Sequence, residues 1–357
     1  MPRHNAALAS LVSVASLGLL VASLGLFVAC AGGPPKAIEL PAVASLEAAS
    51  DLLLDRVEVD DEPPDWLDQD RVAKGHIYGI GIQKGDRRPN EDLYLAMHSA
   101  RRTIVVWLES RGATADEPGS LLPPVRVDPE RIDFERLARD KKANRWYALA
   151  RLDVEREAGL IRAEVEKLEQ RMKAAVERID DDDAPPAVRT RAALGLRYDV
   201  YRRGQYDRLF YALTGEALEH DEDLDDAKLG ALADEALGAH GVRIHIEGSD
   251  VHGLPEAIGV ALGEVGLRTD EFGQGLVSVR LFESDAAFGP DNPYLEIEGT
   301  VETALLGGNE PPTTHSLRVV RTGASLEEAR FGAAREINAD VQQLVRESLR
   351  EIGAPAL

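Results

Sequence analysis

The sequence contains a single cysteine, Cys30, among its 357 residues. One thiol excludes a disulfide within the chain and a zinc site built from several cysteines. Aromatic residues are also scarce, at 5% of the composition. The hydrophobic cores must therefore be built mainly from Leu, Val, Ile and Ala.

Basic residues are outnumbered, because 41 Lys and Arg stand against 63 Asp and Glu, for a net charge of −22. A surface this negative repels phosphate groups, so we do not expect nucleic acid as a partner. For the same reason we do not expect broad adhesion to anionic lipid headgroups.

The segment HIYGIGIQKGDRRPN, which starts at His76, lacks the glycine pattern of a nucleotide site. A dinucleotide fingerprint places three glycines at the turn from a strand to a helix. Here Gly79 and Gly81 fall inside the expected strand, and Lys84 stands at the third position. We interpret the two glycines as places where the strand bends or where the following helix approaches its backbone closely.

Motifs of catalysis are missing as well. No Gly-x-Ser-x-Gly nucleophile elbow occurs, and none of the many carboxylates stands out as a catalytic pair. We therefore expect no catalytic residues, no cofactor and no enzymatic activity.

Two groups of residues resemble metal sites without matching a known motif. His245 and Glu247 share one face of an expected strand, and His252 follows shortly after. The acidic stretch 219–226 resembles a calcium loop, but the EF-hand pattern requires Gly at its sixth position and Glu at its twelfth. Counting from Asp221, Asp226 and Leu232 occupy these positions. We expect surface polar residues and a solvated acidic loop, with metal binding by either group left open.

The N-terminal region combines an uncharged apolar run, from Ala6 to Ala29, with the sequence LFVACAGG around Cys30. The length of the run suits an export signal or a retained membrane helix. The residues at its end resemble the lipobox of bacterial lipoprotein signal peptides, although Phe27 stands where Leu is usual. This resemblance implies that residues 1–29 are removed and that Cys30 carries acyl chains such as palmitate, which anchor the protein in a membrane. Ala31, rather than Asp, follows the cysteine, which in that family implies the outer membrane, with the body facing the periplasm or the surface.

Four regions are expected after the signal peptide. Residues 30–62 are rich in proline and acidic residues and indicate a short tether. Residues 63–153 and 241–353 each indicate a small sheet-plus-helix domain, and residues 154–240 indicate a helical hairpin with further short helices. The expected fold class is α+β, with two such domains separated by the hairpin.

Within the two domains, alternation of apolar residues predicts strands at 76–83 and 145–154, with a helix capped by Asn90 between them. The last domain shows the order β-α-β-β-β-α and ends in a long helix capped by Ser325. This order predicts a small antiparallel sheet with helices on one face.

The hairpin has a heptad pattern. Apolar residues recur at alternating spacings of four and three from Val154 to Ile179, which is typical of a coiled-coil seam. The acidic, proline-containing turn at 180–186 should end this helix, and a second helix should follow, with separate short helices at 206–218 and 226–239. We favour packing of the seam against the second helix. The alternative is an exposed coiled coil that pairs with a partner or another copy.

Several short motifs resemble one family of bacterial envelope proteins. They are PPDW near Pro63, IYGIGI, a helix containing Ala96 and Ala100, and WYALARLDV. Together they are similar to the twenty-kilodalton surface lipoproteins of the outer membrane, a family that includes flagellar accessory lipoproteins. The resemblance covers about residues 63–157 and implies a structural or assembly role.

The sequence thus predicts a non-enzymatic, lipid-anchored envelope protein, a structural or assembly factor of the outer membrane and periplasm for which association with the flagellum is one option. Its expected partners are the membrane and an envelope protein or a second copy. One alternative is a lipoprotein that regulates a peptidoglycan-synthesis enzyme. Another is a periplasmic metal-dependent hydrolase.

Overall fold

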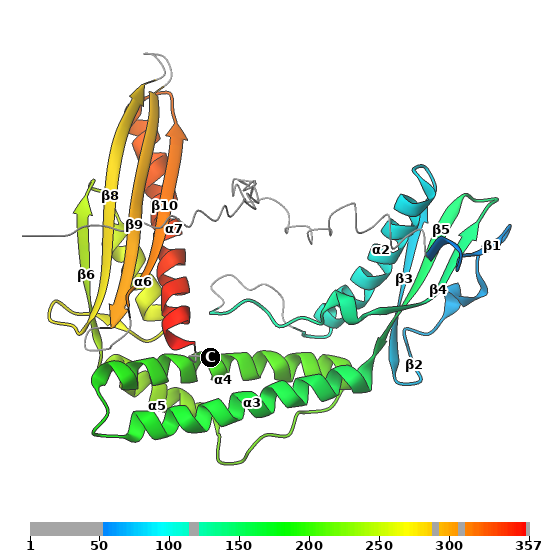
Figure 1. The fold of residues 1–357 in the computed structure, drawn as a ribbon, viewed down its shortest axis with the longest axis horizontal. Coiled ribbons are helices and arrows are strands. Elements are labelled where there is room, and N and C mark those ends of the chain that lie inside the picture. Colours follow the sequence, from blue (N-terminus) through cyan, green and yellow to red (C-terminus); the bar gives the residue numbers. More distant parts are fainter. Residues whose placement is uncertain (1–52, 114–120, 288–292, 306–310, 355–357) are drawn as a thin grey trace, which may run out of the picture. The chain divides into compact units, whose positions relative to one another are not determined.

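The computed structural model describes residues 53–113, 121–287, 293–305 and 311–354. They form two five-stranded sheets and the helices α2 to α7 (Figure 1), which confirms the expected α+β class. Cys30 and residues 1–29 lie outside the described residues. The division into domains at 63, 154 and 241 stays a prediction.

The first sheet has the strand order β1-β4-β5-β3-β2. Its strands are β1 (Glu58–Asp60), β2 (Val72–Ala73), β3 (His76–Lys84), β4 (Asp133–Asp140) and β5 (Arg145–Asp153). β1 runs parallel to β4, and the other pairs are antiparallel. The predicted strands correspond to β3 and β5. β4 was not predicted, and β1 lies in the stretch that the sequence assigned to the tether.

Helix α2 (Pro89–Ser110) covers one face of this sheet, directly over the two glycines of β3. A β-carbon on Gly79 would overlap the carbonyl oxygen of Ala100, and one on Gly81 would overlap the carbonyl oxygen of Ala96. The helix backbone therefore packs against the strand backbone. This confirms the interpretation that the glycines permit the approach of the following helix.

The start of α2 differs from the prediction. Asn90 is not the N-cap, because the helix begins at Pro89 and Arg88 precedes it without a side-chain cap. Proline at the first helical position has the right φ angle and lacks the N–H that a cap would have to satisfy. The side-chain oxygen of Asn90 instead accepts a hydrogen bond from the backbone N–H of Glu91, at 3.0 Å.

The PPDW segment covers the other face of the first sheet. It forms the 3-10 helix η1 (Asp65–Asp68), in which Trp66 is buried. The Trp66 ring meets the ring of Tyr147 edge to face, with centroids 6.5 Å apart. Arg136 of β4 binds the carboxylates of Glu58 and Asp65, at 2.8 and 3.1 Å. These contacts attach the segment before the sheet to the sheet itself.

Helices α3 (Val154–Asp180) and α4 (Pro186–Thr214) form the predicted hairpin. From Ala158 to Ile179 the heptad positions of α3 are buried, and α4 is the element that α3 contacts most. Packing within the chain, the favoured alternative, is therefore confirmed for the described residues. The turn at 180–186 also lies where it was expected.

The second hairpin helix is longer than predicted. No break separates it from the expected helix at 206–218, because α4 continues to Thr214 and ends at Gly215 in the left-handed conformation. The polar residues Arg203 and Gln205, with Gly204 between them, resemble the end of a helix. In the structure they belong to α4, and Arg203 and Gln205 lie on its buried faces, at 2% and 1% exposure.

After α5 (Asp226–Gly238), the second sheet has the order β10-β9-β8-β6-β7. Its strands are β6 (Gly241–Gly248), β7 (Arg268–Thr269), β8 (Gly275–Ala287), β9 (Pro293–Leu305) and β10 (Thr313–Thr322). The sheet is mixed, so the prediction of an antiparallel sheet is wrong at β6, which pairs in parallel with both β7 and β8. The chain leaves β6 through a helix and returns to the same end of the sheet, and this connection makes neighbouring strands parallel.

Helices α6 (Leu254–Glu264) and α7 (Leu326–Gly353) pack together, and the buried residues of the second sheet form one hydrophobic core with them. The hydroxyl of Ser325 accepts a hydrogen bond from the N–H of Glu328 at 3.1 Å, which confirms the predicted cap. Among the described residues, no helix has both the length and the apolar character needed to span a bilayer.

The end of α7 packs tightly on α4 beside a buried tyrosine. A β-carbon on Gly353 would lie 3.1 Å from the Tyr198 ring, and one on Gly195 would lie 2.8 Å from the carbonyl oxygen of Gly353. Tyr198 is 8% exposed, and burial raises its pKa from 10.0 to about 12.

This tyrosine should make the fold sensitive to alkali. Its pKa is higher in the folded chain than in the unfolded chain, so its contribution to stability is complete below pH 10 and is lost as the pH rises toward 12. We compare the free energy of unfolding of Tyr198→Phe with that of the parent protein. We expect the difference to shift by about 1 kcal/mol in favour of the variant when the pH is raised from about 8 to about 11. Urea unfolding at both pH values measures the difference. Equal pH dependence of the two proteins would contradict the assignment.

Candidate functional site

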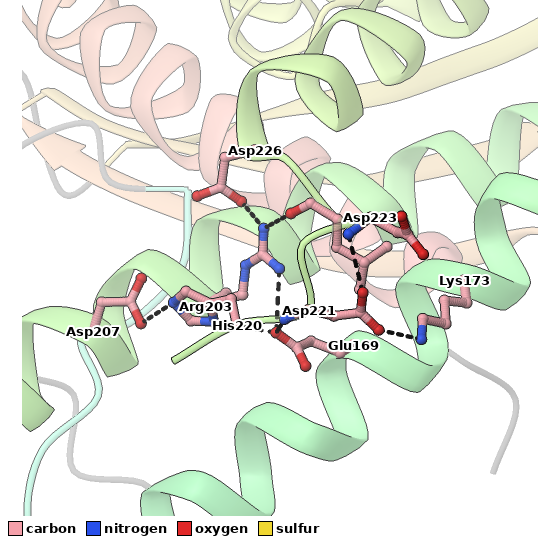
Figure 2. A network of polar contacts seen from close by, with 9 residues as sticks. Glu169, Lys173, Arg203, Asp207, His220, Asp221, Asp223 and Asp226 are labelled. Carbon is pink, nitrogen blue, oxygen red and sulfur yellow. Dashed lines mark hydrogen bonds and ion pairs between the residues drawn. The ribbon is translucent and has the colours of Figure 1, made fainter. Parts of the chain in front are cut away.

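A cluster of polar side chains lies where the segment before α5 crosses the hairpin (Figure 2). Arg203 of α4 is its centre and is 2% exposed. Its guanidinium donates to Glu169 of α3 at 3.4 Å and to the carbonyl oxygen of Leu224 at 2.6 Å, and it also pairs with Asp226 at the start of α5. One buried cation therefore joins three segments.

His220 connects the two hairpin helices a short distance away. Its Nδ1 lies 3.1 Å from Oε1 of Glu169, and its Nε2 lies 2.9 Å from Oδ1 of Asp207. Burial raises the pKa of Asp207, and the nearby His220 and Arg203 oppose that rise. The imidazole ring thus bridges a carboxylate of α3 and a carboxylate of α4.

A third contact, after those of Arg203 and His220, joins the acidic stretch to α3 at the surface. Lys173 of α3 pairs with Asp221, whose other oxygen accepts the N–H of Asp223 at 3.0 Å. The hydrogen bond between Lys173 and Asp221 raises the pKa of Lys173 and lowers the pKa of Asp221. This pair lies in solvent and therefore adds little to stability.

The acidic residues of the stretch 219–226 are exposed, apart from the half-buried Asp221, as expected for a solvated loop, but the stretch is also attached to the hairpin. His220, Asp221 and Asp226 are all held by residues of the hairpin, as the dashed lines in Figure 2 show. The physical reason is that the stretch lies over Lys173 and the buried Arg203, which attract its carboxylates. In chemical terms, the cluster neutralises charge and attaches the start of α5 to the hairpin.

Comparisons with known proteins assign no family. No protein-family model matches the chain, and no curated protein is similar to it. Among solved structures, a secreted protein from Helicobacter pylori matches 78% of this chain and 98% of its own, with 11% identity and a TM-score of 0.34.

Two further solved structures match a smaller part. The rare lipoprotein B from Shewanella oneidensis matches 31% of this chain and 89% of its own, with 13% identity and a TM-score of 0.18. A minor lipoprotein from Acinetobacter baumannii matches 31% and 90%, with 12% identity and a TM-score of 0.21. At these TM-scores the likenesses establish neither a family nor a function.

The structure places the candidate metal ligands His245, Glu247 and His252 on and just after β6, at exposed positions. His245 and Glu247 are both exposed on β6, and Glu247 pairs with Arg280 at 3.3 Å. His252 is exposed beyond the strand, where its carbonyl oxygen accepts from Asn338 at 2.9 Å. In the described part of the chain, no three His, Cys, Asp or Glu residues form a group that could hold a metal ion.

Sequence reasoning missed Arg203 and Gln205, although a signal for both is present. Arg203 lies seven residues from Leu196 and from Phe210, which are both buried. Gln205 lies seven residues from Tyr198 and from Ala212, which are also buried. Residues seven apart lie on the same helix face. The apolar neighbours at this spacing could therefore have placed both polar residues on a buried face.

Proposed function

We propose that this chain is a lipid-anchored protein of the bacterial cell envelope, acylated at Cys30, with a structural or assembly role at the outer membrane. The observation that carries the proposal is the sequence LFVACAGG at the end of an uncharged apolar run. Acyl chains on one cysteine supply enough buried CH₂ groups to retain a protein on a bilayer, with no need for a basic surface. The net charge of −22 suits such an anchor, because it makes electrostatic attachment unfavourable.

The hairpin supports a structural role. Its seam is buried from Ala158 to Ile179, and its central buried cation joins α3, α4 and the start of α5. These side chains are engaged in holding segments together. A factor that positions other envelope components, in the flagellum or elsewhere, needs rigidity of this kind.

Replacement of the cysteine tests the anchor. In a Gram-negative host grown with labelled palmitate, we expect Cys30→Ser to reduce the label in the protein to background. The variant should also keep residues 1–29, which intact mass measures directly. Ala31→Ser is the matched control, because it makes a similar change at the next position and should leave labelling intact.

An unlabelled parent protein that remains in the membrane with residues 1–29 attached would contradict lipidation and would identify the apolar run as a retained anchor. The assembly role has a separate test, which is affinity capture of the acylated protein from detergent-solubilised envelopes. A reproducible stoichiometric envelope partner, lost with Cys30→Ser, is the expected result. Acylated protein that captures no partner would contradict the assembly role.

A further inference from the structure

Strand β3 leaves part of its backbone edge open. β2 pairs with only the first two residues of β3, His76 and Ile77. The N–H of Tyr78 adds one further bond, to the carbonyl oxygen of Arg71 at 2.8 Å. Beyond Tyr78, no described strand lies beside β3 on the side opposite β5, because the sheet order ends with β5-β3-β2. Residues 79–84 therefore form an open edge of the first sheet.

The hydrogen-bonding groups of β3 point alternately to its two edges. Gly85, just after the strand, donates its N–H to the carbonyl oxygen of Asn144, which precedes β5, at 2.8 Å. Tyr78, seven residues earlier, donates in the opposite direction, to Arg71. Residues at even positions therefore direct their backbone groups away from β5. At the open edge these residues are Ile80, Ile82 and Lys84.

Most backbone groups of the open edge lack a partner. The carbonyl oxygen of Ile80 accepts from the hydroxyl of Thr103 on α2, at 3.2 Å. Among the described residues, the N–H groups of Ile80, Ile82 and Lys84 and the carbonyl oxygen of Ile82 have no protein partner. Proline, bulges and charged residues usually protect such an edge. Residues 79–83 contain neither proline nor charge, and their pairing with β5 has no bulge. The edge is therefore competent to pair with another extended chain.

The side of the open edge that faces α2 is basic. Nη1 of Arg71 donates to the carbonyl oxygen of Thr103 at 3.3 Å, and Arg102 is exposed beside Thr103. Within the described part of the chain, neither Arg71 nor Arg102 pairs with a carboxylate. The segments 69–75 and 84–88, which flank the edge, add to this charge: they contain Arg71, Lys74, Lys84, Arg87 and Arg88 against Asp70 and Asp86. In a chain of net charge −22, this local excess of cations favours an acidic partner.

The other side of the open edge is apolar. Ile80 is half-buried and packs with Trp66 and its neighbours, and Ile82 is 50% exposed on the same face of the sheet. In an antiparallel pair, residues directly opposite each other place their side chains on the same face. Residues of an added strand that pair with Ile80 and Ile82 would thus contact apolar side chains. The residues between them would face α2 and its two arginines.

We propose that the open edge of β3 binds an extended acidic segment of a protein partner, which adds an antiparallel strand to the first sheet. The backbone of this segment pairs with Ile80 and Ile82, its apolar side chains contact Ile82, and its carboxylates contact Arg71 and Arg102. The site requires neither the acyl chains nor a membrane, so it can fail its test without affecting the proposed envelope function, and the reverse also holds.

Calorimetric titration of the full-length protein in non-ionic detergent tests the proposal. The probe is a short capped peptide in which glutamate and valine alternate, and we expect saturable binding of one peptide per chain. N-methylation of the valines removes the N–H groups that would face β3 and should weaken binding by about 10-fold or more. N-methylation of the glutamates is the matched control and should leave binding nearly unchanged. Equal affinity of the two methylated peptides would overturn the proposal, as would absence of saturable binding.

A second peptide tests the charge preference. Lysine in place of glutamate should weaken binding by about 10-fold, because its ammonium groups would lie beside Arg71 and Arg102. Equal or tighter binding of the lysine peptide would contradict an acidic partner.

Variants of the protein locate the site. Ile82→Pro removes one donor of the open edge but no bond of the ladder with β5, and it should weaken binding of the glutamate peptide by about 10-fold. Ile82→Thr keeps the N–H and is the matched control, with an expected loss of about 3-fold or less. Equal losses in these two variants, both folded by circular dichroism, would place the peptide elsewhere and overturn the proposal.

The arginines provide a test that does not depend on a proline in the strand. Arg71→Gln combined with Arg102→Gln should weaken binding by roughly 10-fold, because two partly solvated charge contacts are lost. The control is Arg208→Gln combined with Lys228→Gln, which removes the same charge from exposed positions on α4 and α5. Equal losses in the two pairs would show non-specific attraction and overturn the proposal.

Sedimentation of the protein without peptide tests a second copy as the occupant. We expect no self-association through this edge. A dimer that Ile82→Pro abolishes and Ile82→Thr retains would show that the edge pairs with another copy of the chain, which would overturn the proposal of an acidic partner.

Discussion

Replacement of Gly81 by alanine is expected to destabilise the first sheet by about 3 kcal/mol or more, because the new methyl group has no space. A β-carbon at this position would overlap the backbone of α2 at Ala96 and Ala100. Backbone atoms cannot move aside as a flexible side chain can, so α2 must separate from β3. Separation would expose Leu93 and Ile104, which are now completely buried.

Tryptophan fluorescence during denaturant unfolding measures this effect locally. The three tryptophans of the chain are Trp66, Trp107 and Trp146, and all of them pack around the first sheet. Gly159→Ala is the control, because nothing lies within 4 Å of a β-carbon there and the helix should gain roughly 0.5–1 kcal/mol. A Gly81→Ala protein that unfolds at the parent's denaturant concentration would show that α2 and β3 are not in backbone contact.

Replacement of Arg203 by methionine is expected to cost about 2–4 kcal/mol and to free the segment before α5. Glu169, which is 16% exposed, would lose its buried cationic partner. Asp226, which is 52% exposed, can turn to water, so the loss should remain below that of a completely buried pair. The carbonyl oxygen of Leu224 would also lose its donor.

Hydrogen exchange separates this local effect from global unfolding. In the Arg203→Met protein, amides of residues 216–226 should exchange faster, while those of β8 and β9 should keep their protection. Arg208→Met is the matched control, since Arg208 is exposed on the same helix. In Arg203→Lys the exchange rate of these amides should lie between the rates in Arg203→Met and Arg208→Met, because lysine retains the charge without the planar guanidinium group of arginine. Unchanged exchange at 216–226 in Arg203→Met would refute the proposed attachment.

Much of the fold could be predicted where short-range periodicity decides the structure. The alternation in β3, the heptad spacing of α3 and the Ser325 cap each involve residues close together in the chain, and the structure confirms all three. The close approach of α2 to the two glycines of β3 could also be predicted, because glycine inside a strand usually marks a bend or a close approach of another backbone.

Prediction failed where distant contacts override local pattern. β4 was missed because a bulge between Phe134 and Arg136 interrupts its alternation, and that bulge exists only in pairing with β5. The continuity of α4 was missed because Arg203 and Gln205 look like surface residues. Arg203 is buried only because Glu169 and Asp226 arrive from other segments to neutralise it.

The sequence by itself determined the α+β class, the seam of the hairpin and the lipobox-like motif at Cys30, because each depends on residues near one another in the chain. Only the tertiary structure decided the attachment of the acidic stretch to the hairpin, the parallel pairing of β6 and the open edge of β3. These three features depend on side chains or strands that meet only after folding, at positions that no local spacing specifies. Electrostatic attraction, burial and the path of the chain through α6 bring them together.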